Sequence, residues 1–163
     1  MNVLILASAG SEAYRQTLVA LVADAARAHD VRVLAPEAEA KALRPLGVPV
    51  ESWRPSGLFS MLRSTGVLRR AADRSEPDVF HAVGWTAAAV ALGSLAPARA
   101  ARTRVTLLEP IRGNEIPRRF AEQRLPELLR RAERFEVADA ALAGTLTGEL
   151  GVDAARVAIV PPV

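Results

Sequence analysis

Two residues stand at a turn where an anionic ligand could bind. Gly10 and Ser11 follow the apolar run 2–8 and precede a helical pattern. Backbone amides without helical partners and the positive end of the helix favour an anion there, and a glycine lets the backbone approach it. Any turn from a strand into a helix also favours a small residue. The pattern alone therefore leaves an anion site and a purely structural turn equally open.

Two further residues have side chains suited to acid–base catalysis. His81 lies near the end of the apolar run 77–83, within reach of a crevice at the end of that strand. The alternative for His81 is a hydrogen-bonded residue of the core or rim. Glu109 directly follows the apolar run 105–108, where a carboxylate must be paired, exposed or functional. An ion pair with Arg112 is the structural alternative for Glu109.

The elements that must position these residues alternate along the whole chain. Strands are expected at 2–8, 31–34, 48–53, 77–83, 104–108, 138–143 and 157–160. Helices are expected after an N-cap at Ser11 and at 37–46, 58–74, 85–95, 115–135 (interrupted at Pro126) and 145–150. This alternation predicts an α/β fold, Rossmann-like and doubly wound, with a mainly parallel sheet of about seven strands and helices on both faces. Pro49 predicts an edge position for the third strand.

The topology expected for such a sheet brings the candidate residues together. In open parallel sheets, ligands bind at the carboxyl ends of the strands, near the point where the strand order reverses. Gly10, Ser11, His81 and Glu109 all follow or approach such strand ends. The usual dinucleotide fingerprint needs three spaced glycines, of which only Gly10 is present, and the phosphate-binding loop with its lysine is absent. A nicotinamide or flavin enzyme is therefore disfavoured.

Composition excludes several other kinds of chemistry. The 163 residues fit one domain, 1–163, and the absence of cysteine excludes disulfides, thiolate metal sites and cysteine nucleophiles. Two histidines leave little material for a metal site, and a site built from carboxylates stays open. Aromatic residues make up only 4%, which argues against nucleic-acid binding. The start of the chain has no signal-peptide pattern, so a cytoplasmic location is expected. Arginines in 118–134 are mixed with glutamates, which favours a solvated face over peripheral membrane contact.

Four segments, in their order and spacing, resemble the N-terminal half of family-four-type glycosyltransferases with the GT-B fold. They are 27–34 (Arg-Ala-His-Asp-Val-Arg-Val-Leu), 77–82 (Pro-Asp-Val-Phe-His-Ala), 138–143 (Ala-Asp-Ala-Ala-Leu-Ala) and 150–161, from Leu-Gly-Val to Val-Pro. The resemblance implies a metal-independent transfer from a nucleotide-sugar donor, which is a substrate and not a resident cofactor. The acceptor would be a sugar or a lipid-linked molecule.

The same resemblance implies how the work is divided between domains. This chain would be the acceptor-side half, inactive without the C-terminal donor-binding domain that it lacks. The loop at Gly10 and Ser11 would approach the donor diphosphate. His81 and Glu109, chosen from their positions at strand ends, are the expected catalytic residues. A Gly10→Val substitution would then weaken donor binding and leave the fold largely in place.

Several positions depart from the family pattern, and two of the departures fall where the family has residues suited to catalysis. Val83 stands where the family often has a second histidine, and Leu108-Glu109 stands where it often has His-Asp. A non-catalytic Rossmann-like module that binds a ligand or a partner is therefore the alternative function.

Overall fold

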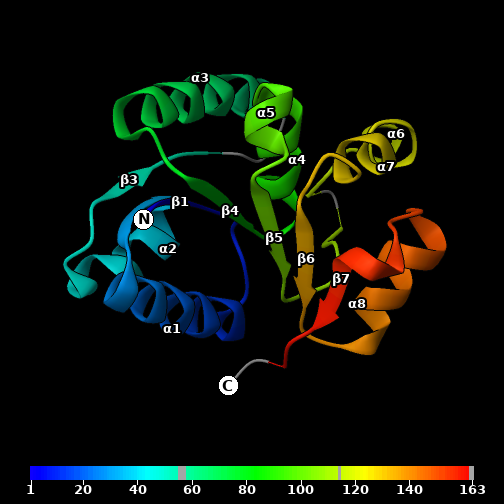
Figure 1. The fold of residues 1–163 in the computed structure, drawn as a ribbon, viewed down its shortest axis with the longest axis horizontal. Helices are drawn as coiled ribbons and strands as arrows, with labels where there is room; N and C mark the ends of the chain where they lie inside the picture. Colours follow the sequence, from blue (N-terminus) through cyan, green and yellow to red (C-terminus); the bar gives the residue numbers. More distant parts are fainter. Residues whose placement is uncertain (55–57, 114, 162–163) are drawn as a thin grey trace.

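The computed structural model describes residues 1–54, 58–113 and 115–161, and its strands form one parallel sheet (Figure 1). The seven strands lie in the order β3-β2-β1-β4-β5-β6-β7, and every neighbouring pair is parallel. The strands are β1 (Asn2–Ala7), β2 (Asp30–Ala35), β3 (Val50–Ser52), β4 (Val79–Val83), β5 (Thr103–Leu107), β6 (Arg134–Val137) and β7 (Val157–Ile159). The predicted Rossmann-like α/β fold is confirmed, and β3 is an edge strand as Pro49 predicted.

Helices connect the strands and cover both faces of the sheet (Figure 1). The α-helices are α1 (Glu12–Ala28), α2 (Glu37–Leu43), α3 (Leu58–Ser75), α4 (Trp85–Ser94), α5 (Pro97–Ala100), α6 (Arg118–Gln123), α7 (Leu125–Leu129) and α8 (Ala140–Gly144). Shorter turns follow at η1 (Arg44–Leu46), η2 (Thr145–Glu149) and η3 (Ala154–Arg156). Among the residues described, no helix is both long and apolar enough to cross a membrane.

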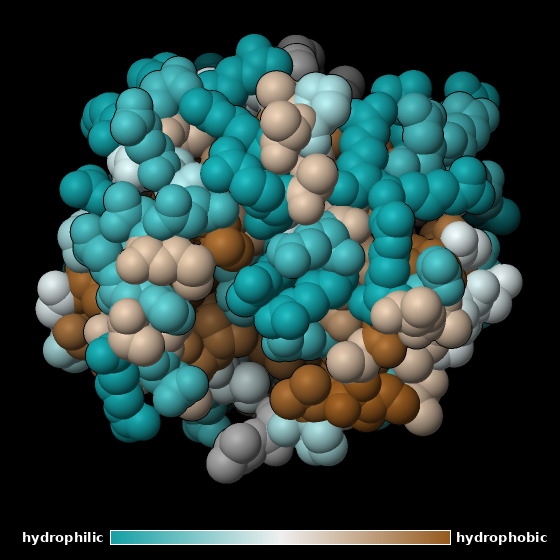
Figure 2. All heavy atoms as spheres, in the orientation of Figure 1, coloured by the Kyte–Doolittle hydropathy of each residue, from teal (hydrophilic) through white to brown (hydrophobic). Residues whose placement is uncertain are grey.

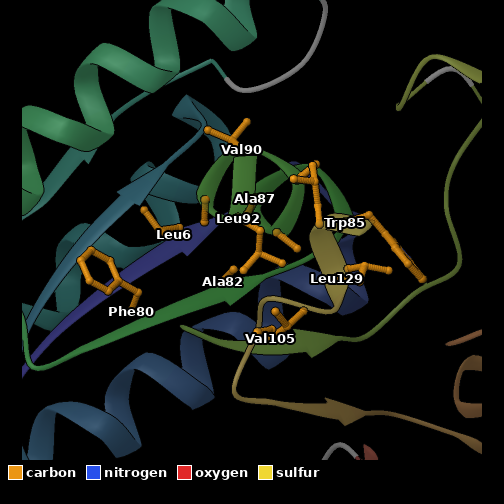
Figure 3. Close-up of a cluster of buried hydrophobic side chains, with 14 of the residues drawn as sticks. Leu6, Phe80, Ala82, Trp85, Ala87, Val90, Leu92, Val105 and Leu129 are labelled. Carbon is orange, nitrogen blue, oxygen red and sulfur yellow. The ribbon is translucent and has the colours of Figure 1, made fainter. Parts of the chain in front are cut away.

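Two hydrophobic cores lie on opposite faces of the sheet because successive strand residues point to opposite sides. Leu4 and Leu6 of β1 belong to the larger core, together with Phe80 and the buried residues of α4 (Figure 3). Ile5 of β1 belongs to the smaller core, which α1 covers with Leu18. Every residue of α4 from Trp85 to Leu92 is buried. The small alanines there let this helix pack closely against the sheet.

The sixth strand lies four residues earlier than predicted. The expected strand at 138–143 is wrong: β6 is Arg134–Val137, and 140–144 form α8. In β6, Phe135 and Val137 are buried while Arg134 is exposed and Glu136 is half-buried, which is the period of a strand. Asp139 then starts α8 by accepting a hydrogen bond from the amide of Leu142. The predicted long helix over 115–135 is accordingly two short helices that end before β6.

The surface combines hydrophilic and apolar regions. Charged and polar residues dominate the upper part of the view over α3, whereas hydrophobic residues gather over the end of β7 (Figure 2). Ile159 and Val160 at that end are 51% and 50% exposed. Side chains of this kind bury favourably against another surface.

Candidate functional site

A narrow crevice lies at the carboxyl ends of β1, β4 and β5. The chain leaves β1 toward β2 on one side and returns to β4 on the other, so the strand order reverses between β1 and β4. The crevice has a volume of about 10 Å³, which is room for about one water molecule. Its lining comes from three loops and the first turns of α1 and α4: Ser8, Ala9, Tyr14, Gly84, Trp85, Leu108, Glu109, Pro110 and Glu115.

Gly84 lets the loops after β1 and β4 touch each other. Its φ of +99° is a conformation that residues with a side chain rarely adopt. A Cβ atom there would lie 2.5 Å from Oγ of Ser8 and 2.6 Å from its Cβ. The Ser8 hydroxyl in turn accepts a hydrogen bond of 2.9 Å from the amide of Ala87 in the first turn of α4. The glycine therefore sets the narrow width of the crevice.

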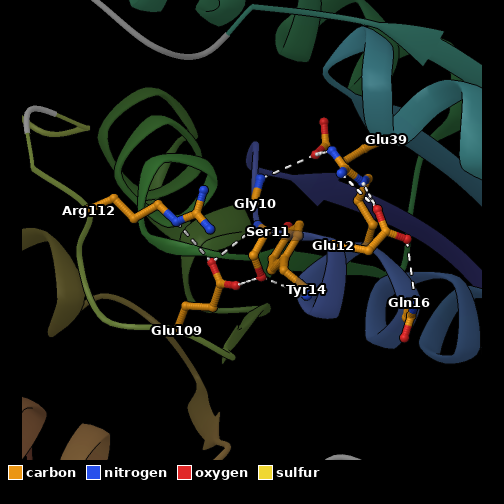
Figure 4. A network of polar contacts seen from close by, with 9 residues as sticks. Gly10, Ser11, Glu12, Tyr14, Gln16, Glu39, Glu109 and Arg112 are labelled. Carbon is orange, nitrogen blue, oxygen red and sulfur yellow. Dashed lines mark hydrogen bonds and ion pairs between the residues drawn. The ribbon is translucent and has the colours of Figure 1, made fainter.

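The predicted anion-binding loop contains anions supplied by the chain itself (Figure 4). The Gly10 amide donates to Oε1 of Glu39 at 3.2 Å, and the Ser11 amide lies 3.5 Å from Oε2 of Glu109. The Ser11 hydroxyl donates to Oε1 of Glu109 and accepts from the amide of Tyr14, which makes Ser11 the N-cap of α1 as predicted. The loop has the donors expected of an anion site, and two carboxylates occupy them.

Glu109 lies in the crevice and also forms the ion pair that was the structural alternative for it. Nε of Arg112 lies 3.2 Å from Oε2 of Glu109, whose side chain is 23% exposed. The indole of Trp85 donates to the backbone carbonyl of Glu109 at 2.8 Å. The carboxylate is thereby held over the N-terminus of α1 while one side stays open to solvent.

The substitution Gly10→Val would disturb the fold, contrary to the expectation from the sequence. A Cβ on Gly10 would lie 2.0 Å from Cδ1 of the Tyr14 ring. Tyr14 is buried, and its hydroxyl donates to the carbonyl of Val83 at 2.9 Å. Burial, followed by the nearby carboxylate of Glu39, raises the pKa of Tyr14 above its ordinary value. The ring therefore has little freedom to move aside.

His81 lies apart from the residues that line the crevice. It sits two residues before the end of β4, on the sheet face that α1 partly covers, and its Nε2 lies 2.7 Å from Oγ1 of Thr106. Burial, with Arg104 and Arg134 nearby, lowers the pKa of His81 to about 4. The ring is thus neutral at physiological pH. The structure brings Gly10, Ser11 and Glu109 together and leaves His81 outside that cluster.

Two glutamates at the site were missed by the sequence reasoning. Glu39 of α2 is 1% exposed, its Oε1 lies 3.7 Å from Nη1 of Arg15, and its Oε2 has no hydrogen-bond partner among the described residues. Glu115 accepts from the hydroxyl of Thr86 at 2.8 Å and from the amide of Arg112 at 3.2 Å. The sequence did contain a signal that Glu39 would be buried. It lies next to Ala40 and four residues before Leu43, which places it on the apolar stripe of a short helix.

The crevice carboxylates do not form a recognisable metal site. Within the described ranges, no group of three or more His, Cys, Asp or Glu side chains is placed to hold a metal ion. The arrangement can offer a ligand one partly exposed carboxylate, a serine hydroxyl, one arginine and the amides of the α1 N-terminus.

The fold and the crevice at the reversal of strand order define a Rossmann-like α/β domain. More specifically, the chain belongs to the glycosyl transferase 4-like domain family, whose model matches residues 9–162. No curated protein sequence matches the chain.

Similar folds occur among solved structures. Anabaena HepE in complex with UDP has a TM-score of 0.72 and 17% identity over 99% of this chain and 44% of its own. A glycosyltransferase from Rickettsia africae has a TM-score of 0.65 and 10% identity over 98% of this chain and 42% of its own. The glycotransferase of kitacinnamycin has a TM-score of 0.60 and 14% identity over 99% of this chain and 51% of its own. The chain thus spans about half the length of these proteins.

Proposed function

We propose that this chain is the acceptor-side domain of a glycosyltransferase that takes its sugar from a nucleotide-sugar donor. A second Rossmann domain would hold most of the donor, and this chain alone would not turn over substrate. Family membership and the coverage of about half of HepE support this division. HepE has been solved with UDP, with UDP-glucose, and with UDP and glucose, so a UDP-sugar is the donor class we propose.

One observation carries the proposal: Ser11, Glu109 and Arg112 meet at the point where strand order reverses, at the N-terminus of a long helix. Glu109 is the proposed catalytic carboxylate because it combines partial exposure with hydrogen-bonded orientation. It would accept the proton of the acceptor hydroxyl while that oxygen bonds to the anomeric carbon of the sugar, the bond from that carbon to the diphosphate breaks, and UDP leaves. His81 is the second catalytic candidate, but a neutral ring with a pKa of about 4 is a weak base.

Donor binding would require the loop to exchange its own carboxylates for a diphosphate. Gly10 and Ser11 would supply the amides, and Glu39 and Glu109 would have to release them. Two like charges about 4 Å apart repel by about 1 kcal/mol in water and about 4 kcal/mol at the surface of a protein. The diphosphate and the Glu109 carboxylate therefore compete for the same hydrogen-bond donors of Ser11. Arg112, which pairs with Glu109 in the structure, can pair with either anion.

The first test is the mass of the native gene product. A species of more than twice the 17.4 kDa of this chain is expected, because a second Rossmann domain of similar size must be present. A native product of this size with no partner chain would contradict the assignment as half of an enzyme.

The second test uses the intact protein with Glu109→Gln, compared with Glu122→Gln on the exposed face of α6. For Glu109→Gln we expect turnover to fall about 100-fold or more, as when a positioned acid–base group is removed. Affinity for UDP should rise, because a negative charge that competes with the diphosphate is gone. The Glu122 variant should match the unmodified protein. Unchanged turnover in Glu109→Gln would refute the catalytic role, and unchanged UDP affinity would refute the role of the loop.

A further inference from the structure

A second and larger cavity lies on the far side of α4 from the sheet. Its volume is about 420 Å³, against about 10 Å³ for the crevice. Residues of α3, α4, α6 and α7 line it, together with Pro117 and Arg124 at the two ends of α6. In Figure 3, Val90 of α4 points away from the strand residues Ala82 and Val105, toward this region.

Carbon atoms dominate the floor of the cavity. Ala89, Val90 and Leu128 line it and are almost fully buried from solvent, whereas Pro117 and the half-buried Phe120 form its side. Gly93 lines it at an exposed position, where an added Cβ would meet only Cδ1 of Leu128, at 3.5 Å. Such a surface offers few hydrogen bonds to a sugar and suits a hydrocarbon chain.

Positive charge gathers at the rim. Arg119 lines the cavity, is exposed, and has no ion-pair partner among the described residues. Arg124 also lines it, and its ion-pair partner among the described residues, Glu127, lies 3.9 Å away. Arg69 donates to the carbonyl of Ser94, another lining residue, through two nitrogens at 3.4 Å each. The rim therefore complements an anionic group next to an apolar chain.

The cavity and the candidate site are separate hollows that lie along the same helix, α4. Thr86, Ala89, Val90 and Gly93 have the spacing of residues on a single helix face. Thr86 is bonded to Glu115 of the crevice, and the other three line the cavity. With a rise of about 1.5 Å per residue, the cavity residues lie about 6 to 12 Å beyond Trp85. A molecule with its head at Glu109 could thus reach the cavity with its tail.

We propose that this cavity binds the hydrocarbon chain of a lipid-linked acceptor whose anionic group pairs with Arg119 and Arg124. The proposal rests on the glycosyltransferase function and deepens it by naming the acceptor class. A methylene group is about as large as a water molecule, which occupies about 30 Å³ in the liquid, so the cavity accommodates on the order of a dozen carbons. The acceptor is therefore an amphiphile with a tail of at least that length.

The test measures binding of dodecyl phosphate to the intact protein, below the concentration at which it forms micelles. Ethyl phosphate has the same head without the tail, and dodecyl maltoside has the tail without the charge. We expect dodecyl phosphate to bind at least 10-fold more tightly than either. Equal binding of dodecyl and ethyl phosphate would reduce the site to a surface phosphate contact and overturn the proposal.

Two pairs of variants locate the binding. Gly93→Phe fills the cavity from an exposed position and should weaken dodecyl phosphate binding at least 10-fold, whereas Gly93→Ala should bind as the unmodified protein does. Arg119→Gln should weaken dodecyl phosphate about 3- to 10-fold and leave dodecyl maltoside unchanged. Arg118→Gln is its control, because Arg118 is exposed on the same helix and paired with Glu122. Unaltered affinity in Gly93→Phe and Arg119→Gln would overturn the proposal.

Two further outcomes separate this proposal from the function on which it rests. If the protein binds dodecyl phosphate specifically but transfers no sugar, the cavity would still be a binding site for an anionic amphiphile, and the glycosyltransferase function would be wrong. If the protein transfers sugar and Gly93→Phe does so at the same rate, the glycosyltransferase function would stand and the role of the cavity in acceptor binding would be wrong. A dimer that Gly93→Phe dissociates would show a second copy of the chain on this surface, and the lipid assignment would be wrong.

Discussion

Mildly acidic pH should destabilise the folded chain, because His81 takes up a proton more readily in the unfolded chain than in the folded one. Its pKa is lowered from 6.5 to about 4, mainly by burial and then by the charges of Arg104 and Arg134. Those arginines pair with Glu133 and Glu136 respectively, and the histidine itself contacts the Thr106 hydroxyl. Below pH 6.5 the unfolded chain takes up a proton that the folded chain does not accept until about pH 4. The contribution of His81 to the free energy of unfolding is therefore fully present above pH 6.5. It is lost as the pH decreases from 6.5 to 4.

The size of this effect follows from the pKa difference. Each unit of pKa corresponds to 1.36 kcal/mol, so the full shift allows a loss of about 2 kcal/mol between about pH 7.5 and about pH 5. His81 is partly exposed, and solvent screening reduces the value to about 1–2 kcal/mol. With a urea dependence of about 2 kcal/mol per molar, the midpoint of unfolding should fall by about 0.5 to 1 M.

The assay compares urea unfolding of the chain and of His81→Gln at these two pH values. Glutamine can keep a hydrogen bond to Thr106 without gaining a proton. The variant should therefore lose less stability on acidification, by the amount calculated above, while other groups contribute equally to both proteins. An identical fall in midpoint for the two proteins would refute the argument that the fold keeps His81 neutral.

Two glycine substitutions test the packing around the crevice and a third substitution tests the cap of α8, with Gly144→Ala as their common control because nothing lies within 4 Å of a Cβ there. Gly84→Ala should lower the free energy of unfolding by about 2 kcal/mol or more, since its φ of +99° and the contact with Ser8 both oppose a side chain; a loss no larger than in the control would contradict this. Gly10→Ala should cost about 1–3 kcal/mol by displacing the Tyr14 ring, and a crystal structure with the ring unmoved would disprove the clash. Asp139→Ala should cost about 1 kcal/mol through loss of the cap on α8, measured by thermal unfolding, and an unchanged midpoint would show that the cap is dispensable.

The order of elements could be predicted where the hydrophobic pattern was unambiguous. The apolar runs that became β1, β4 and β5 are buried on both faces, so their lack of alternation was informative. The pattern failed at β6, where residues 130–135 continue an arginine-rich helical period and the alanine-rich segment 138–143 has the apolar content of a strand. There the choice depends on burial of Phe135 and Val137 against neighbouring elements, together with the cap formed by Asp139.

The candidate site was predictable in part for the same reason. Gly10, Ser11 and Glu109 could be chosen because strand ends in a parallel sheet meet at one edge, whatever the details of packing. His81 was chosen by the same rule, but its position two residues before the strand end directs it toward Thr106 on the sheet face. The rule identifies the edge of the sheet and does not determine which way a side chain points.

The sequence alone thus determined the α/β class, the approximate positions of most strands and the loop most suited to an anion, because these depend on local periodicity and on single residues such as Gly10. Tertiary packing decided that Glu39 and Glu109 occupy the amides of that loop. It also decided that Gly84 narrows the crevice against Ser8, and that helices α3, α4, α6 and α7 line an open apolar cavity. Each of these contacts joins residues far apart in the chain, and their proximity follows only from how the helices pack on the sheet.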